Sequence, residues 1–199
     1  MEHDRHGARQ PERFDPARAA GLNDSARFNY LSPGDVLSML DTPQGATLVD
    51  FGAGTGLYAI EIASARPDLS VIALDEQEKM LEFLRVNLAQ RPTPHLRPLL
   101  SKDVEAKKLR GQVDRILALN VLHELGDDAM IELKALLNKT GRVLFIDWNS
   151  EVERPIGPPK DHVYSVSEGV ARVEHFGFSV VERRLFLYHY ALSCVLKSV

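Results

Sequence analysis

The sequence contains one cysteine, no long apolar run and no excess of positive charge. Cys194 has no second cysteine with which to form a disulfide inside the chain, which is consistent with a reducing, cytoplasmic compartment. The longest apolar runs, such as residues 116–119 and 143–146, are far too short to cross a bilayer, so we expect no membrane partner. The charged residues 2–9 have no apolar stretch after them, which predicts that they are not a secretory signal.

The charge balance argues against polyanionic partners. A formal net charge of -4 at pH 7 provides no overall attraction to nucleic acid or to anionic lipid, and we expect no nucleic acid as a partner. His3 and His6 stand near the start of the chain, where histidines are more often incidental than ligands. We therefore expect no metal site.

The length and composition fit one globular domain. The chain has 199 residues, of which 44% are hydrophobic and 26% are charged, and this is ordinary for one water-soluble core. Residues 1–31 are polar, and we predict that they form an arm on a domain that spans residues 32–199. The arm carries too many apolar side chains to leave in water, so it either closes a site as a lid or packs only for stability; these side chains are Phe14, Leu22, Phe28, Tyr30 and Leu31.

Short strands and helices alternate from residue 33 onward. Ser32 and Pro33 suit the N-cap and the first position of a helix. Strand-like runs are then separated by segments with helical spacing, which predicts a parallel sheet covered by helices on both faces. Pro98 lies inside one run and predicts that this strand is at a sheet edge. The predicted strands are residues 47–50, 71–74, 96–100, 113–119 and 142–147, and the predicted helices are 57–65, one carrying Met80, Leu84 and Leu88, and one carrying Met130, Leu133 and Leu137 that ends at 139–141.

The last third of the chain has a different pattern. Ser165 and Glu168 form a capping box for a helix that Gly177 ends. Two β-rich runs follow, residues 179–187 and 190–196, and the short link between them permits a hairpin but no parallel crossover. The predicted fold is therefore α/β and doubly wound, with a mostly parallel seven-stranded sheet that one antiparallel strand completes.

A glycine turn follows the first predicted strand and opens a helix. The segment Asp50-Phe51-Gly52-Ala53-Gly54-Thr55-Gly56 lies where doubly wound sheets bind ligands, and glycines let the backbone approach a ligand closely. Dinucleotide sites use the spacing G-x-G-x-x-G, whereas here it is G-x-G-x-G. The Asp50 carboxylate would repel a pyrophosphate, but it suits a ligand's ammonium group.

This turn resembles motif I of the class I S-adenosylmethionine-dependent methyltransferases. The resemblance implies a cofactor, S-adenosyl-L-methionine, held by Asp50, Gly52, Ala53, Gly54 and Gly56. Asp75 ends the second strand, where an acidic side chain accepts both ribose hydroxyls. The resemblance further implies that Glu76 and Gln77 flank the adenine.

Two more segments resemble the family. Ser101-Lys102-Asp103-Val104 follows the third strand, and the resemblance implies that Asp103 and Val104 contact the adenine. Residues 113–124 resemble the ubiquinone/menaquinone-biosynthesis-like group of small bacterial members. In that group the residue at Asn120 lies beside the cofactor, and a histidine follows at the position of His123.

The resemblance implies methyl transfer to a small molecule. His123 is the candidate general base because imidazole titrates near neutral pH, although it is equally well explained as a residue that only orders its loop. If the arm is a lid, Tyr30 and Arg27 can reach the donor's carboxylate or the acceptor. A small-molecule acceptor is the expected partner, and the pattern allows a homodimer.

Two other functions stay open on the sequence. One is a regulatory protein that binds S-adenosylmethionine without turnover, which the complete pocket motifs disfavour. The other is a nicotinamide-dependent oxidoreductase, which Asp50 and the glycine spacing disfavour.

Overall fold

The protein is built around one seven-stranded sheet with the strand order β3-β2-β1-β4-β5-β7-β6. The computed structural model describes residues 15–16 and 22–197. The strands are β1 (Thr47–Phe51), β2 (Ser70–Asp75), β3 (Leu96–Leu100), β4 (Val113–Leu119), β5 (Leu137–Trp148), β6 (Phe178–Leu185) and β7 (His189–Leu196). The helices are α1 (Pro33–Leu40), α2 (Leu57–Ala65), α3 (Glu78–Gln90), α4 (Val104–Lys107), α5 (Asp127–Leu136) and α6 (Val166–His175), with the 3-10 helices η2 (Ser25–Asn29), η3 (Leu122–Glu124) and η4 (Lys160–His162).

The sheet has the predicted direction of its strands. Strands β1 to β5 pair in parallel, and β7 is antiparallel to both β5 and β6. The prediction of a mostly parallel sheet with one antiparallel strand is thus confirmed. The antiparallel strand lies between β5 and β6, because β7 hydrogen-bonds to both of them, and β6 is the edge. Pro98 lies in the opposite edge strand, β3, as predicted.

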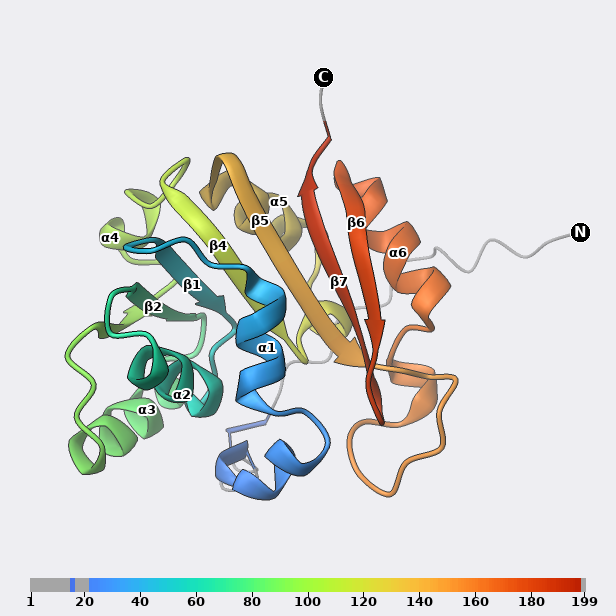
Figure 1. Ribbon diagram of the computed structural model, residues 1–199, viewed down its shortest axis with the longest axis horizontal. Helices are drawn as coiled ribbons and strands as arrows, with labels where there is room; N and C mark the ends of the chain where they lie inside the picture. Colours follow the sequence, from blue (N-terminus) through green and yellow to red (C-terminus); the bar gives the residue numbers. More distant parts are fainter. Residues whose placement is uncertain (1–14, 17–21, 198–199) are drawn as a thin grey trace, which may run out of the picture.

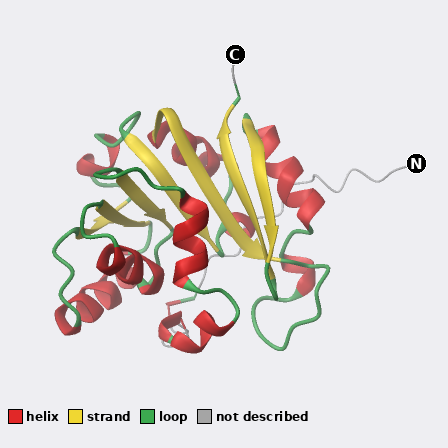
Figure 2. Ribbon diagram, viewed as in Figure 1, coloured by secondary structure: helices red, strands yellow, loops and turns green. Residues whose placement is uncertain are grey.

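Helices cover both faces of the sheet, and each face has its own core. Helices α1, α2 and α3 bury their apolar sides on one face, and α4, α5 and α6 bury theirs on the other. Figure 1 shows α1 crossing in front of the sheet and α6 behind β6, and Figure 2 shows the same two helical layers. Neighbouring strand residues such as Leu48 and Val49 belong to opposite cores, as strand alternation requires. Among the described residues, no helix is long and apolar enough to cross a membrane.

The described part of the arm is tied to the domain. Phe28 packs edge-on against Tyr58 of α2 with ring centroids 5.5 Å apart, and the Tyr58 hydroxyl donates to the Leu31 carbonyl at 2.8 Å. In Figure 1 this segment lies beyond the end of the sheet toward which β1 and β5 point. Phe14 and residues 17–21 lie outside the described residues, so the predicted role of the whole arm stays a prediction.

The helix ends show which boundaries could be predicted from residues nearby in the chain. Ser32 caps α1 and Ser165 with Glu168 forms a complete capping box on α6, both as predicted. The predicted end of the fifth helix at 139–141 is wrong, because α5 ends at Leu136 and residues from Leu137 onward already form β5. Leu137 pairs with Val113 of β4 before a shift in register, so contact with the sheet overrides the helical spacing. The short helix α4 was not predicted.

Candidate functional site

The glycine turn joins β1 to α2 in a backbone shape that only glycine takes without strain. Gly52, Gly54 and Gly56 have φ values of 75°, 56° and 79°. A Cβ on Gly56 would lie 2.1 Å from Cδ1 of Leu84 in α3, and one on Gly52 would lie 2.8 Å from Cγ1 of Val121. The turn is thus packed between the helix after β2 and the loop after β4.

Asp75 lies at the end of β2, as predicted, and supports the glycine turn. Its Oδ2 accepts a hydrogen bond from the Gly54 N–H at 2.8 Å, and its Oδ1 accepts one from the Gln77 N–H at 2.9 Å. Burial raises the pKa of the Asp75 carboxyl, while the two backbone donors lower it and Glu76 and Glu124 raise it. Each carboxylate oxygen retains a second acceptor site for a ligand.

A cavity of about 470 Å³ opens at the ends of β1, β2 and β4. Among the described residues, six carboxylic acid side chains line it but only one cationic side chain, Arg27 from the arm. The cavity therefore favours a ligand that carries positive charge and at least one anionic group. Its walls are formed by Leu22, Arg27, Asp50, Phe51, Gly52, Ala53, Gly54, Thr55, Leu57, Tyr58, Leu74, Asp75, Glu76, Gln77, Met80, Ser101, Leu119, Asn120, Val121, Glu124, Leu125, Asp128, Ala129 and Glu132.

Asp50 is buried and lines this cavity. Burial raises its pKa, and the nearby Asp75 carboxylate raises it further, to about 7. A buried carboxyl group with a like charge nearby binds a cation more favourably than an exposed one does. The cation offsets both the cost of burying the negative charge and the repulsion from the neighbouring carboxylate. The ammonium partner that the sequence predicts for Asp50 stays a prediction.

Asn120 lies in the loop after β4 with its amide in the cavity wall. Its φ is 58°, and its backbone N–H donates to the Ile146 carbonyl at 2.7 Å, which holds it beside the end of β5. Among the described residues its side-chain nitrogen and oxygen are both buried without a hydrogen-bond partner. Such an amide is costly unless a ligand or water satisfies it, so Asn120 points to a polar ligand.

His123 does not line the cavity. Its ring is 6% exposed, with Nδ1 2.8 Å from Asp147 Oδ1 and Nε2 3.5 Å from Glu124 Oε1. Burial opposes the charged ring, but attraction and hydrogen bonding to Asp147, with a further contribution from Glu124, raise its pKa to about 10. This shift favours a protonated ring, which is unsuited to accept a further proton, and the predicted role of His123 as a general base stays a prediction.

Three other predicted residues lie away from the cavity. Tyr30 stacks on His189 and contacts Trp148, with ring centroids 5.7 and 6.0 Å away. Asp103 precedes α4, and Val104 is 69% exposed. The structure places Ser101 in the cavity wall but neither Asp103 nor Val104, which lie at the start of α4.

Several lining residues were not predicted. Glu124 ends η3 and Leu125 follows it, and Asp128, Ala129 and Glu132 lie on the first turns of α5. Their sequence carries no recognisable ligand motif, because they reach the cavity only through the packing of α5 beside the loop after β4. His3 and His6 lie outside the described residues, and within those residues no group of three potential metal ligands occurs.

The fold and sequence match known methyltransferases. A family model described as "Methyltransferase domain" matches residues 49–145, about half of the chain. A SAM-dependent methyltransferase from Aquifex aeolicus superposes with a TM-score of 0.84 and 27% identity, over 92% of this chain and 98% of that one. A putative type 11 methyltransferase from Sulfolobus solfataricus superposes with a TM-score of 0.67 and 23% identity, over 85% and 94% of the two chains, which supports the fold.

Curated relatives match a shorter region. The Ribosomal RNA small subunit methyltransferase G of Chromobacterium violaceum is 36% identical over 83 residues, which are 41% of this chain and 39% of the relative. The protein of the same name from Mycobacterium leprae is 29% identical over 136 residues, 68% of this chain and 44% of the relative. The chain thus spans less than half the length of these relatives.

These relatives overturn one expectation from the sequence. Their names state a ribosomal RNA substrate, so the exclusion of nucleic acid as a partner is wrong. That exclusion relied on the net charge of the whole chain, but a formal charge of -4 does not prevent local contact with a phosphate backbone.

The strand order agrees with the structural matches. The cofactor that this family and fold imply is S-adenosylmethionine. By its fold, its cavity and these matches, the chain belongs to the class I S-adenosylmethionine-dependent methyltransferases.

Proposed function

We propose that the protein transfers the methyl group of S-adenosylmethionine to an RNA acceptor. The observation that carries the methyltransferase activity is the cavity that Asp50, the glycine turn and Asp75 enclose at the ends of β1 and β2. The acceptor class is supported by the names of the relatives from Chromobacterium violaceum and Mycobacterium leprae. The narrower resemblance of residues 113–124 to the ubiquinone/menaquinone-biosynthesis-like group stays a prediction.

The residues of the cavity fit the chemical groups of this cofactor. Asp50 suits the ammonium group, Arg27 suits the carboxylate, and Asp75 suits the ribose hydroxyls. The unpartnered amide of Asn120 offers one donor and one acceptor beside them. The excess of carboxylates over Arg27 is complementary to a sulfonium cation, whereas a pyrophosphate would meet repulsion.

The arm completes the cavity in this proposal. Leu22 and Arg27 both line the cavity although they precede the domain of residues 32–199. Leu22 also lies close to the glycine turn, because a Cβ built on Gly54 would be 3.5 Å from Leu22 Cδ1. We propose that residues 22–31 act as a lid that holds the cofactor and excludes water. Tyr30, near the end of this segment, packs against His189 and Trp148 and does not line the cavity.

Methyl transfer requires the side chains mainly to position the reactants. Bound S-adenosylmethionine supplies a methyl group that its sulfonium already activates, so the protein accelerates the reaction by holding the nucleophile in line and excluding water. Asn120, Val121 and Leu119 line the cavity at the end of β4, beside Asp50, and are suited to shape the path to the acceptor.

The proposal is tested with a methyl-labelled cofactor. Purified protein, labelled S-adenosylmethionine and protein-free ribosomal RNA are incubated together, and we expect label that precipitates with the RNA and is released by ribonuclease. An Asp75→Ala variant at equal concentration is the control. Binding of S-adenosylhomocysteine without label transfer to RNA would contradict the RNA acceptor, and failure to bind either cofactor form would contradict the methyltransferase itself.

A further inference from the structure

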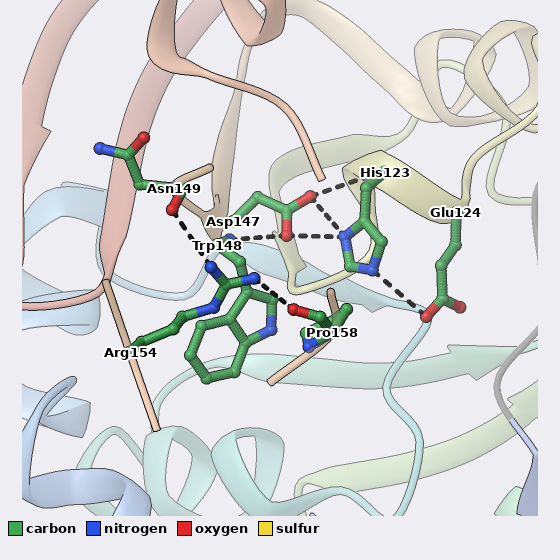
Figure 3. Close-up of polar contacts among 7 residues, drawn as sticks. All are labelled: His123, Glu124, Asp147, Trp148, Asn149, Arg154 and Pro158. Atoms are coloured by element: carbon green, nitrogen blue, oxygen red, sulfur yellow. Dashed lines mark hydrogen bonds and ion pairs between the residues drawn. The ribbon is translucent and has the colours of Figure 1, made fainter. Parts of the chain in front are cut away.

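His123 is held between two carboxylates from different parts of the chain. Nδ1 lies 2.8 and 2.9 Å from the two oxygens of Asp147 at the end of β5, and Nε2 faces Glu124 at 3.5 Å. Figure 3 shows the ring between them, with one nitrogen turned to each side. A carboxylate accepts hydrogen bonds and does not donate them, so each neighbour favours a proton on the nitrogen that faces it.

Asp147 is the anchor of this arrangement. Its side chain is fully buried and also accepts from the backbone N–H groups of His123 and Trp148, each at 2.8 Å. A buried carboxylate is costly unless charged and polar partners surround it. The ring of His123 is the one cationic group in direct contact with it among the described residues, while Arg154 lies near enough to contribute electrostatically.

The loop that His123 anchors forms one wall of the cavity. The Glu124 N–H donates to the Val121 carbonyl at 2.8 Å, and the Val121 side chain covers Gly52. Glu124 and Asn120 line the cavity on either side of Val121. A fixed link from His123 to β5 therefore restrains the wall that faces the glycine turn.

We propose that His123 is a positioning residue that stays doubly protonated and ties the Asn120–Glu124 loop to Asp147, rather than a base in methyl transfer. The proposal rests on the proposed function only where turnover is concerned. Its structural part concerns the charge on the ring and the binding of the cofactor product.

His189 provides an internal contrast. This fully buried histidine of β7 stacks between Trp148, at 4.1 Å between centroids, and Tyr30, and neither of its ring nitrogens has a partner among the described residues. Burial, together with repulsion from Arg27 and Arg154, lowers the pKa of His189 to about 3. Attraction from Asp147 opposes this shift. The pKa values of these two buried histidines are thus shifted in opposite directions, and direct contact with carboxylates distinguishes His123 from His189.

The charge on the ring is tested by long-range 1H–15N correlation spectra at pH 8, with His123→Asn used to assign the signal. We expect both ring nitrogens of His123 to be protonated. Asp147→Asn removes the anionic partner and should return a neutral ring at this pH. A neutral His123 in the wild-type protein at pH 8 would overturn the proposal without any turnover assay.

The positioning role is tested by two substitutions that differ in one property. His123→Asn keeps a donor near the position of Nδ1 but cannot take up a proton, whereas His123→Ala removes the donor. We expect His123→Asn to bind S-adenosylhomocysteine within about threefold of wild type and His123→Ala to bind roughly tenfold more weakly, as expected for loss of the hydrogen bond to Asp147.

Turnover adds a second readout where an acceptor is in hand. A positioning role predicts that His123→Asn retains much more activity than His123→Ala. A general base predicts that both lose roughly 10²–10⁴-fold alike, and that result would overturn the proposal. If no acceptor is methylated, the proposed function fails, while the spectra and the binding data still decide the state of His123.

Discussion

The backbone N–H of Gly54 donates to Oδ2 of Asp75, so the acidic residue at the end of β2 holds the glycine turn that follows β1. The two parts of the predicted cofactor motif are therefore one hydrogen-bonded unit. Asp75 therefore stabilises the glycine turn in addition to making the ribose contact that we propose for it.

Replacing Asp75 should weaken cofactor binding strongly. We expect Asp75→Ala to lower the affinity for S-adenosylhomocysteine by about 10- to 100-fold, since charge-assisted hydrogen bonds contribute roughly 1.5–3 kcal/mol. Isothermal titration calorimetry gives this directly. Asp68→Ala is the matched control, because Asp68 also accepts a backbone hydrogen bond, from Gly45, but does not line the cavity. Equal affinity in the Asp75 and Asp68 variants would contradict the ribose assignment.

Binding of the cofactor product should depend on pH through Asp50. Burial and the neighbouring Asp75 raise the pKa of Asp50 to about 7, and only its ionised form attracts an ammonium group. Affinity for S-adenosylhomocysteine should therefore be full above pH 8 and fall as pH decreases below 7, approaching tenfold per pH unit. Calorimetry between pH 5.5 and pH 8.5 measures the slope. An unchanged slope in Asp50→Asn would show that another group is responsible.

Arg27 is the cationic residue of the proposed lid, residues 22–31, and is proposed to bind the carboxylate of the cofactor. Because it is the one cationic side chain that the described part of the chain contributes to the cavity wall, Arg27→Gln should weaken binding of S-adenosylmethionine by roughly tenfold, as expected when a charge-assisted hydrogen bond to a carboxylate is lost. Arg85→Gln removes an exposed arginine that pairs with Glu78 on α3 and controls for the change in net charge. The lid role would be contradicted by wild-type affinity in Arg27→Gln.

Gly56 is expected to be essential for stability. A Cβ there would lie 2.1 Å from Leu84 Cδ1, and φ is 79°, so Gly56→Ala suffers both a clash and backbone strain. We expect a loss of about 2–4 kcal/mol, measured by urea unfolding. Gly45→Ala separates the two causes, because Gly45 has φ of 72° with nothing within 4 Å of its Cβ position, and it should lose only about 1 kcal/mol. Similar losses in both variants would show that the contact with Leu84 is not what matters.

The sequence by itself determined the features that depend on neighbours in the chain. The strand over Val113–Leu119, the helix over Leu57–Ala65 and the capping box of Ser165 with Glu168 follow from periodicity and from polar groups a few residues apart. The glycine spacing and Asp75 were recognisable because the parallel topology places the ends of successive strands at one edge.

Only the tertiary structure decided the features that depend on distant partners. Leu137 is a strand residue because Val113 pairs with it, and Asp103, at the start of α4, does not line the cavity. His123 has the sequence of a candidate base, yet Asp147, 24 positions later, lies against its ring and raises its pKa. The charge state of a buried group is set by desolvation and by the charges folded against it, and neither can be read from the residues beside it in the chain.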